Sequence, residues 1–202
     1  ESRGMDGPEG SVHRTNLRAP NDNFILKYTF GKGGYAEYYP HCTFFGYRYI
    51  SVTATGKVTF KSIKSIPVTS IAKSLESGTI TTGNELINKL ISNTYWGQLS
   101  NYLSVPTDCP QRNERMGWTG DAQMFCKTAS YNMETYAFYA KYLRDLWVEQ
   151  KDHDGMVGHL VPSFIKKEPT ETSFYWGSCA WGDAAVIIPW TLYTHYGDAY
   201  IL

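Results

Sequence analysis

Hydrophobic and polar residues follow two different patterns along the chain, and the change falls near Gly78. Before it, β-branched and aromatic residues dominate the segments 24–30, 43–53 and 57–63, where they alternate in places with polar ones. Glycine-containing turns separate these segments. A period of two bounded by turns is typical of strands. We therefore expect three or four antiparallel strands, which would make half of a β-sandwich but not a closed one.

After Gly78 the period becomes helical. Apolar residues recur at helical spacing from Leu86 to Tyr95 and predict a helix that ends near Leu103. The segment 81–84 supplies candidate N-caps for this helix, because it contains threonine and asparagine side chains.

Two more helices are predicted further along. The pattern favours one long helix from about Asp121 to Gln150, with most of its large apolar residues on one side. A third helix starts near Trp181, with Asp183 as a candidate cap and Pro189 in its first turns or at a kink. Long loops between helices that alternate in direction fall at one end, where they would build a shared site.

The loop from Val105 to Asp121 carries an unusual concentration of functional groups. Prolines and glycines interrupt any regular element there. It contains three carboxylates, two guanidiniums and an indole: Asp108, Glu114, Asp121, Arg112, Arg115 and Trp118. A solvated turn whose charges pair with one another is the plain interpretation. The loop combines several charges with an aromatic side chain that can stack on a ligand and a Cys-Pro pair that restricts the backbone. This combination favours a binding or catalytic loop instead.

The chemistry that this loop suits is hydrolysis of a glycosidic bond. That reaction needs one acid to protonate the leaving oxygen and a second carboxylate to activate water. Glu114 is the candidate acid, because neighbouring carboxylates such as Asp108 and Asp121 favour a protonated partner. Neighbouring arginines would instead favour the ionised form of Glu114. One or both of Arg112 and Arg115 must therefore point elsewhere or pair with the two aspartates.

The remaining groups suit sugar recognition. Asp108, Arg112 and Asp121 can make strong charged hydrogen bonds to hydroxyl groups. Asp121 fits an N-cap equally well. Trp118 can stack on a sugar face or fill a core, and the sequence leaves both open.

The amino-acid composition limits the classes of molecule that the protein is expected to bind. Lys+Arg 19 balances Asp+Glu 19, so no strong field attracts nucleic acid or an anionic membrane. No apolar run is long enough to span a bilayer. The aromatic content of 15% suits stacking on sugars, although a thick core uses aromatics equally well. The four cysteines and five histidines show no metal-binding spacing, and free thiols or an incidental pair are both possible.

The segment 108–121, with the sequence DCPQRNERMGWTGD, resembles the signature of the bacterial α-L-rhamnosidases, which are inverting glycoside hydrolases with an (α/α)6 barrel. Asn113 departs from the aspartate usual there, and Met116 from the usual leucine. The segment 44–49 (FFGYRY) is similar to the end of the β-sandwich that precedes that barrel. Two further stretches, WGDA from Trp181 and the residues 189–198, resemble the family's third-helix region.

This resemblance implies an α+β fold, with the C-terminal part of a β-sandwich over residues 1–70 and the first helices of an (α/α)6 barrel over residues 71–202. It implies that Glu114 is the general acid, and that no metal or organic cofactor takes part. The substrate would be a terminal non-reducing α-L-rhamnosyl residue of an oligosaccharide, glycoside or polysaccharide. The residues expected to contact the rhamnose ring are Asp108, Arg112, Trp118 and Asp121, with Trp181 adding an apolar wall.

The family's general base is a glutamate several helices further on, which would lie beyond Leu202. The chain opens on Glu1 without an initiator methionine and closes within an apparent amphipathic helix, so we expect the remainder of a longer polypeptide. We expect the 202 residues alone to be inactive. The downstream glutamates that are present have no motif that recommends them as the base: Glu134, Glu149, Glu168 and Glu171. The compartment stays open between periplasmic or secreted and cytoplasmic.

Two other functions remain open from the sequence. One is a glycosidase of the same barrel type with another sugar specificity, because related folds share this architecture. The other is a non-catalytic carbohydrate-binding module, in which the same groups hold a sugar without cleaving it. A second carboxylate facing Glu114 would separate an enzyme from a binder.

Overall fold

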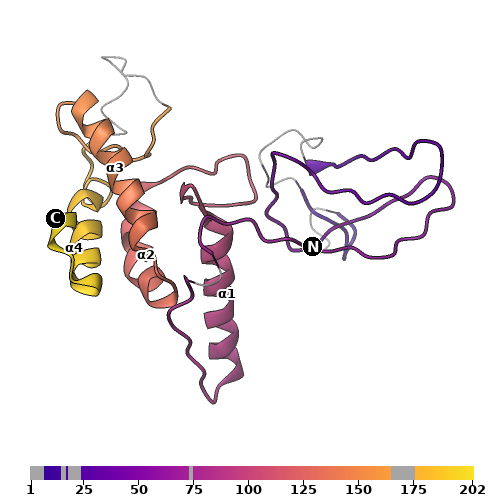
Figure 1. The fold of residues 1–202 in the computed structure, drawn as a ribbon, viewed down its shortest axis with the longest axis horizontal. Helices are drawn as coiled ribbons and strands as arrows, with labels where there is room; N and C mark the ends of the chain where they lie inside the picture. Colours follow the sequence, from indigo (N-terminus) through magenta and orange to yellow (C-terminus); the bar gives the residue numbers. More distant parts are fainter. Residues whose placement is uncertain (1–6, 15–16, 18–23, 73–74, 165–175) are drawn as a thin grey trace. The chain divides into compact units, whose positions relative to one another are not determined.

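The computed structural model describes residues 7–14, 17, 24–72, 75–164 and 176–202. The chain divides into two compact units (Figure 1). The amino-terminal unit comprises Glu1–Ile66 and Pro110–Glu114, and the helical unit comprises Pro67–Cys109 and Arg115–Leu202.

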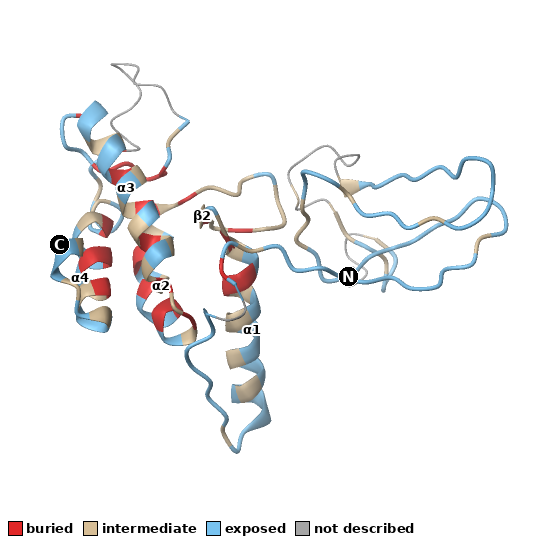
Figure 2. Cartoon of the chain, in the orientation of Figure 1, coloured by how far each residue is buried: buried red, intermediate tan, exposed pale blue. Residues whose placement is uncertain are grey.

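The amino-terminal unit does not form the strands that the alternating pattern predicts. Its described residues contain no strand, and none of them is buried (Figure 2). Local contacts dominate, such as the Tyr28 ring against Phe30 and Tyr38 and the hydrogen bond of 2.7 Å from the Tyr47 hydroxyl to Ser65 Oγ. A strand is stabilised only when neighbouring strands pair with its backbone. The β-sandwich therefore stays a prediction.

Helix α1 (Glu85–Asn101) confirms the first predicted helix. Asn84 is its N-cap, and its side-chain oxygen accepts hydrogen bonds from the backbone N–H groups of Leu86 and Ile87. One buried side chain ties the end of α1 to the next helix. Gln98 Nε2 donates to the Ala129 carbonyl at 3.2 Å, and Gln98 Oε1 accepts from Asn132 at 2.9 Å.

After α1 the chain makes a very short hairpin. Strands β1 (Tyr102–Leu103) and β2 (Val105–Pro106) pair antiparallel. Ser104 lies between them in the left-handed region, with φ 67. The hairpin leads directly into the charged loop.

The single long helix predicted from Asp121 to Gln150 is wrong. The structure has α2 (Thr119–Asn132) and α3 (Tyr136–Asp152), separated by an extended and buried Met133. Neither glycine nor proline marks the break. Tertiary contacts hold it instead, because Thr135 donates its backbone N–H to the Tyr196 hydroxyl at 2.9 Å and its Oγ1 lies 2.8 Å from Ser130 Oγ.

Helix α4 (Ala184–Tyr196) confirms the third predicted helix, with Pro189 inside it. Asp183 precedes the helix, but its side chain makes no capping bond. Asp183 is the N-cap residue of α4, as predicted, and its Oδ2 accepts from the Ala180 N–H at 3.0 Å. Gly197, with φ 77, ends α4, and the 3-10 helix η5 (Ala199–Ile201) follows, so no amphipathic α-helix continues through the last residues.

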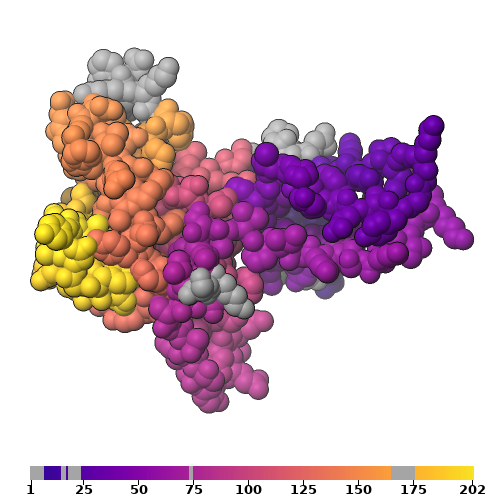
Figure 3. All heavy atoms as spheres, viewed as in Figure 1, coloured from indigo at the N-terminus to yellow at the C-terminus, as the bar shows by residue number. Residues whose placement is uncertain are grey.

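The core of the helical unit lies between α2, α3 and α4. Helix α4 packs against both α2 and α3, and in the space-filling view the orange atoms of α3 and the yellow atoms of α4 lie against one another (Figure 3). Most residues of the buried cluster come from these three helices, including Cys126, Tyr139, Tyr142, Ile188 and Leu192. Burial raises the pKa of the Cys126 thiol to about 12, which makes it unreactive.

No disulfide joins the four cysteines, all of which lie in the described part of the chain. Among the helices that the structure describes, none is sufficiently long and apolar for a membrane span.

Candidate active site

Asp108 closes the charged loop at its base. Its backbone N–H donates to the Met116 carbonyl at 3.1 Å, and its Oδ1 accepts from the Met116 N–H at 3.0 Å. This reciprocal pair brings the two ends of the segment 109–115 together. The Asp108 carboxylate therefore orders the loop in addition to any contact with a sugar.

Glu114 forms an ion pair with Arg112 inside the amino-terminal unit. Arg112 Nε lies 2.6 Å from Glu114 Oε2, and the two side chains are 31% and 18% exposed. The sequence predicts that one or both arginines point elsewhere or pair with the aspartates, and Arg112 pairs with Glu114.

Arg115, the next residue, belongs to the helical unit and has a strained backbone. Its φ is 53, in the left-handed region that side chains other than glycine rarely adopt. Burial lowers the pKa of its guanidinium from the ordinary value. Strain of this kind costs free energy and often occurs at functional sites.

The residues after the loop are held by a second segment of the helical unit. Residues 117–119 pair antiparallel with 159–161: the Val161 N–H donates to the Gly117 carbonyl and the Thr119 N–H to the His159 carbonyl, both at 2.9 Å. The approach is so close that a Cβ on Gly117 would lie 2.2 Å from the Val161 carbonyl oxygen. Only glycine fits there.

Asp121 lies in the first turn of α2, and Trp118 is the N-cap residue of that helix. The alternative that Asp121 is an N-cap is therefore wrong. A carboxylate in a first turn is stabilised by the helix dipole.

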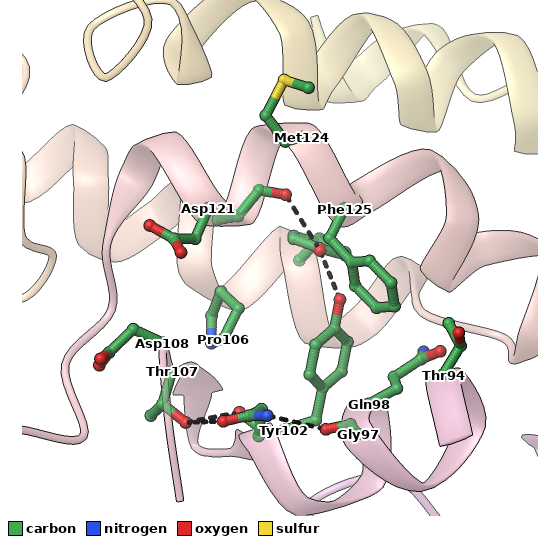
Figure 4. Close-up of a pocket in the computed structure, with 13 residues that line it drawn as sticks. Thr94, Gly97, Gln98, Tyr102, Pro106, Thr107, Asp108, Asp121, Met124 and Phe125 are labelled. Atoms are coloured by element: carbon green, nitrogen blue, oxygen red, sulfur yellow. Dashed lines mark hydrogen bonds between the residues drawn. The ribbon is translucent and has the colours of Figure 1, made fainter. Parts of the chain in front are cut away.

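Asp108 and Asp121 line the same hollow, whose volume is about 460 Å³ (Figure 4). The two carboxylates lie at one end of the lining residues, and the hydroxyl of Tyr102, another lining residue, is hydrogen-bonded to that of Tyr139. The end of α1, the β1–β2 hairpin and the first turns of α2 form the walls. Its apolar lining includes Pro106, Phe125 and Tyr139. The hollow combines apolar surface with two hydrogen-bonding acids, as small-ligand sites do.

The two candidate tryptophans lie beside the start of α2. Trp181 packs against Gly120, one residue before Asp121, and keeps 36% of its surface exposed. Its ring centroid lies 5.1 Å from that of His159, with the planes 31° apart. Trp118 has intermediate exposure, so it is not a buried core residue.

The structure thus assigns Asp108, Trp118, Asp121 and Trp181 to the helical unit and Arg112 and Glu114 to the amino-terminal unit. Sequence reasoning missed His159, which it set aside for lack of a metal-binding spacing. No sequence signal marks His159, because its neighbours come from segments about 40 and 20 residues away.

The downstream glutamates that the structure describes accept hydrogen bonds from backbone N–H groups. Glu134 Oε1 accepts from the Tyr136 N–H at 2.6 Å, and Glu149 Oε1 accepts from the Ser163 N–H at 2.8 Å. Glu168 and Glu171 lie outside the described residues. The expected independence from cofactors stays a prediction.

Comparison with known proteins accounts for nearly the whole chain. Residues 75–202 match the family model of the bacterial α-L-rhamnosidase 6 hairpin glycosidase domain, and residues 5–69 match that of the bacterial α-L-rhamnosidase concanavalin-like domain. An α-L-rhamnosidase of Streptomyces avermitilis is 41% identical over 199 residues, which cover 96% of this chain and 18% of that protein. One of Formosa agariphila is 35% identical over 201 residues, covering 98% of this chain and 20% of that protein.

A solved structure supports the same relationship. The crystal structure of Streptomyces avermitilis α-L-rhamnosidase complexed with L-rhamnose matches 60% of this chain and 11% of its own, at 44% identity and a TM-score of 0.54. The chain spans about a fifth of the length of the curated relatives that it matches.

Proposed function

Because the chain belongs to the bacterial α-L-rhamnosidase family, we propose that the full-length protein that carries it hydrolyses terminal non-reducing α-L-rhamnosyl residues from rhamnosides. The observation that carries this proposal is the hollow in which Asp108 and Asp121 lie at one end. These carboxylates come from the two ends of the segment 108–121 that resembles the family signature.

Sugar recognition would divide between charged and aromatic groups. Asp108, Asp121 and Arg112 would bond the hydroxyls of rhamnose, since charged partners make short hydrogen bonds. Trp118 and Trp181 would contact the apolar face of the ring. The half-exposed state of both indoles supports this assignment.

Glu114 would protonate the leaving oxygen in an inverting acid–base mechanism. Its Oε2 lies 2.6 Å from Arg112 Nε. In this proposal Arg112 turns from Glu114 to a sugar hydroxyl when substrate binds. The general base would stand roughly 6.5–9.5 Å from the acid. It would come from outside these residues, so the 202 residues alone would be inactive.

The architecture behind this chemistry is also a proposal. The amino-terminal residues, up to about 70, would be the end of a β-sandwich, and residues 71–202 would be the first helices of an (α/α)6 barrel. The boundary is supported by the family matches, which stop at residue 69 and resume at residue 75. The helices of the second unit support the barrel portion.

The test is the substitution Glu114→Gln in the full-length protein, with hydrolysis of aryl α-L-rhamnosides as the assay. Loss of a general acid should lower kcat by about 10²–10⁴-fold. The loss should be smaller for an aryl leaving group of low pKa, which needs no protonation. Glu85→Gln, at an exposed glutamate in the first turn of α1, is the matched control and should keep wild-type activity.

Three results would change the proposal. Wild-type activity in Glu114→Gln would remove Glu114 as the acid. If the protein hydrolysed glycosides of another sugar and not rhamnosides, it would still be a glycosidase, but its proposed specificity for rhamnose would be wrong. Binding of L-rhamnose with no turnover of any glycoside by the full-length protein would favour a carbohydrate-binding module.

A further inference from the structure

Trp181 lies unusually close to the backbone of α2. An ideal Cβ built on Gly120 would lie 3.0 Å from Trp181 Nε1, 3.1 Å from Cε2 and 3.2 Å from Cδ1. Ordinary contacts between carbon atoms are about 3.5–4.0 Å long. The indole therefore occupies the space that any larger residue at position 120 would need.

Helix stability does not explain a glycine at this position. Gly120 is the second residue of α2, and glycine is less favourable than alanine in a helix by about 1 kcal/mol. Its φ is not in the left-handed region, so an alanine could adopt the same backbone. The close approach of Trp181 is the remaining reason for glycine here.

A second contact fixes the same indole. The His159 ring is buried and lies with its centroid 5.1 Å from that of Trp181. The backbone of His159 is itself held, because its carbonyl accepts from the Thr119 N–H at 2.9 Å. Burial lowers the pKa of His159, so the ring that contacts the indole is neutral near pH 7.

The loop that carries Trp181 is anchored to the same helix. Ala180, immediately before Trp181, has a φ of 68, which is strained for a residue with a side chain. Both of its backbone polar groups are bonded: Gln123 Nε2 of α2 donates to its carbonyl, and its N–H donates to Asp183 Oδ2 at 3.0 Å. The strain is therefore maintained by contacts on both sides.

We propose that Gly120 is a positioning residue for the Trp181 platform, because its lack of a side chain lets the indole pack against the first turn of α2, which also carries Asp121. Gln123 assists by holding the loop that carries Trp181. This inference rests on the proposed function, because it takes the exposed part of Trp181 as a contact for rhamnose. It assigns Gly120 and Gln123 to substrate binding, although neither touches the sugar.

Gly120→Ala in the full-length protein is the test. The added methyl group should displace the indole, and KM for an aryl α-L-rhamnoside should rise by about 3–10-fold while kcat changes by less than about 2-fold. Gly83→Ala is the matched control, because a Cβ there meets nothing within 4 Å, and its KM should not change.

A double-mutant cycle with Trp181→Ala separates positioning from a general structural effect. Gly120→Ala should raise KM no further once the indole is gone, because the methyl group then has nothing to displace. Gln123→Leu is a second variant and should raise KM in the same direction, with kcat again nearly unchanged.

The outcomes that overturn the inference differ from those that overturn the function. Equal KM values in wild type and Gly120→Ala, or an undiminished Gly120→Ala effect in the Trp181→Ala background, reject the positioning role while rhamnoside hydrolysis stands. Wild-type KM in Trp181→Ala rejects the platform itself. Absence of rhamnoside hydrolysis by the wild-type protein rejects the proposed function, and the positioning role with it.

Discussion

The two units of this chain differ in how completely they bury their apolar residues. The helical unit has a continuous core in which Tyr139, Ile188 and Leu192 are fully inaccessible. In the amino-terminal unit, no described residue is buried. A helix makes its backbone hydrogen bonds within its own segment, whereas a strand needs other strands. Helical segments can therefore form and pack where isolated strand sequences cannot.

This difference also divides the candidate site. Asp108, Asp121 and Trp181 belong to the unit with the core, where a hydrogen bond holds Asp108 and Trp181 packs against Gly120. Arg112 and Glu114 belong to the other unit. Most of the groups proposed to bind the sugar ring thus belong to the helical unit, whereas the proposed acid does not.

The largest expected effect concerns the core itself. Ile188→Ala should destabilise the helical unit by about 2–5 kcal/mol, because Ile188 is 0% exposed and its removal leaves a cavity. The measurement is urea unfolding of the full-length protein, followed by tryptophan fluorescence.

The matched substitution in the other unit is Ile66→Ala. Ile66 is 71% exposed, so its change should alter the free energy of unfolding by no more than about 0.5 kcal/mol. An equal loss at both positions would break the comparison and would mean that another segment of the full-length protein covers Ile66.

A smaller effect is expected at Gly117. A methyl group there would lie 2.2 Å from the Val161 carbonyl oxygen, so Gly117→Ala must separate the segments 117–119 and 159–161. We expect a loss of about 1–3 kcal/mol, as for other overpacked sites. Urea unfolding measures it, with Gly83→Ala as the control in open space. Wild-type stability in Gly117→Ala would contradict the close pairing.

The smallest expected effect is a dependence of stability on pH at the end of the helical unit. The Tyr136 hydroxyl, which donates to Asp198 Oδ2, and the Tyr200 N–H lower the pKa of the Asp198 carboxyl. A lowered pKa in the folded state contributes stability that is present above the unfolded value and is lost as pH falls through the folded one.

Asp198→Asn should therefore lower the melting temperature slightly at pH 7, and the difference from wild type should shrink below about pH 4. Tyr136→Phe removes the main donor and should reproduce this change. A difference that stays constant from pH 7 to pH 3 would exclude the Asp198 carboxylate as its cause.

Local sequence was sufficient where the stabilising contacts are local. The start of α1 followed from Asn84, whose side chain bonds only two and three residues ahead. Pro189 within α4 was predicted from the same kind of pattern. The candidate site residues at 108–121 came from one continuous segment, so the sequence could name them.

Features that depend on contacts between residues far apart in sequence could not be predicted from the sequence. The break between α2 and α3 depends on Tyr196, which lies about 60 residues from Thr135 in sequence. Which arginine pairs with Glu114 depends on side-chain geometry. The charges in the sequence left this open, and in the structure the partner is Arg112.

The sequence by itself determined the family, the charged loop and most helix boundaries, because these depend on residues that are adjacent or a few positions apart. Only the tertiary structure decided that Gly117 and Gly120 are glycines for steric reasons, and that His159 and Trp181 share the start of α2. Those facts depend on how closely two distant segments approach. That distance is set by the packing of the whole core, and no local pattern encodes it.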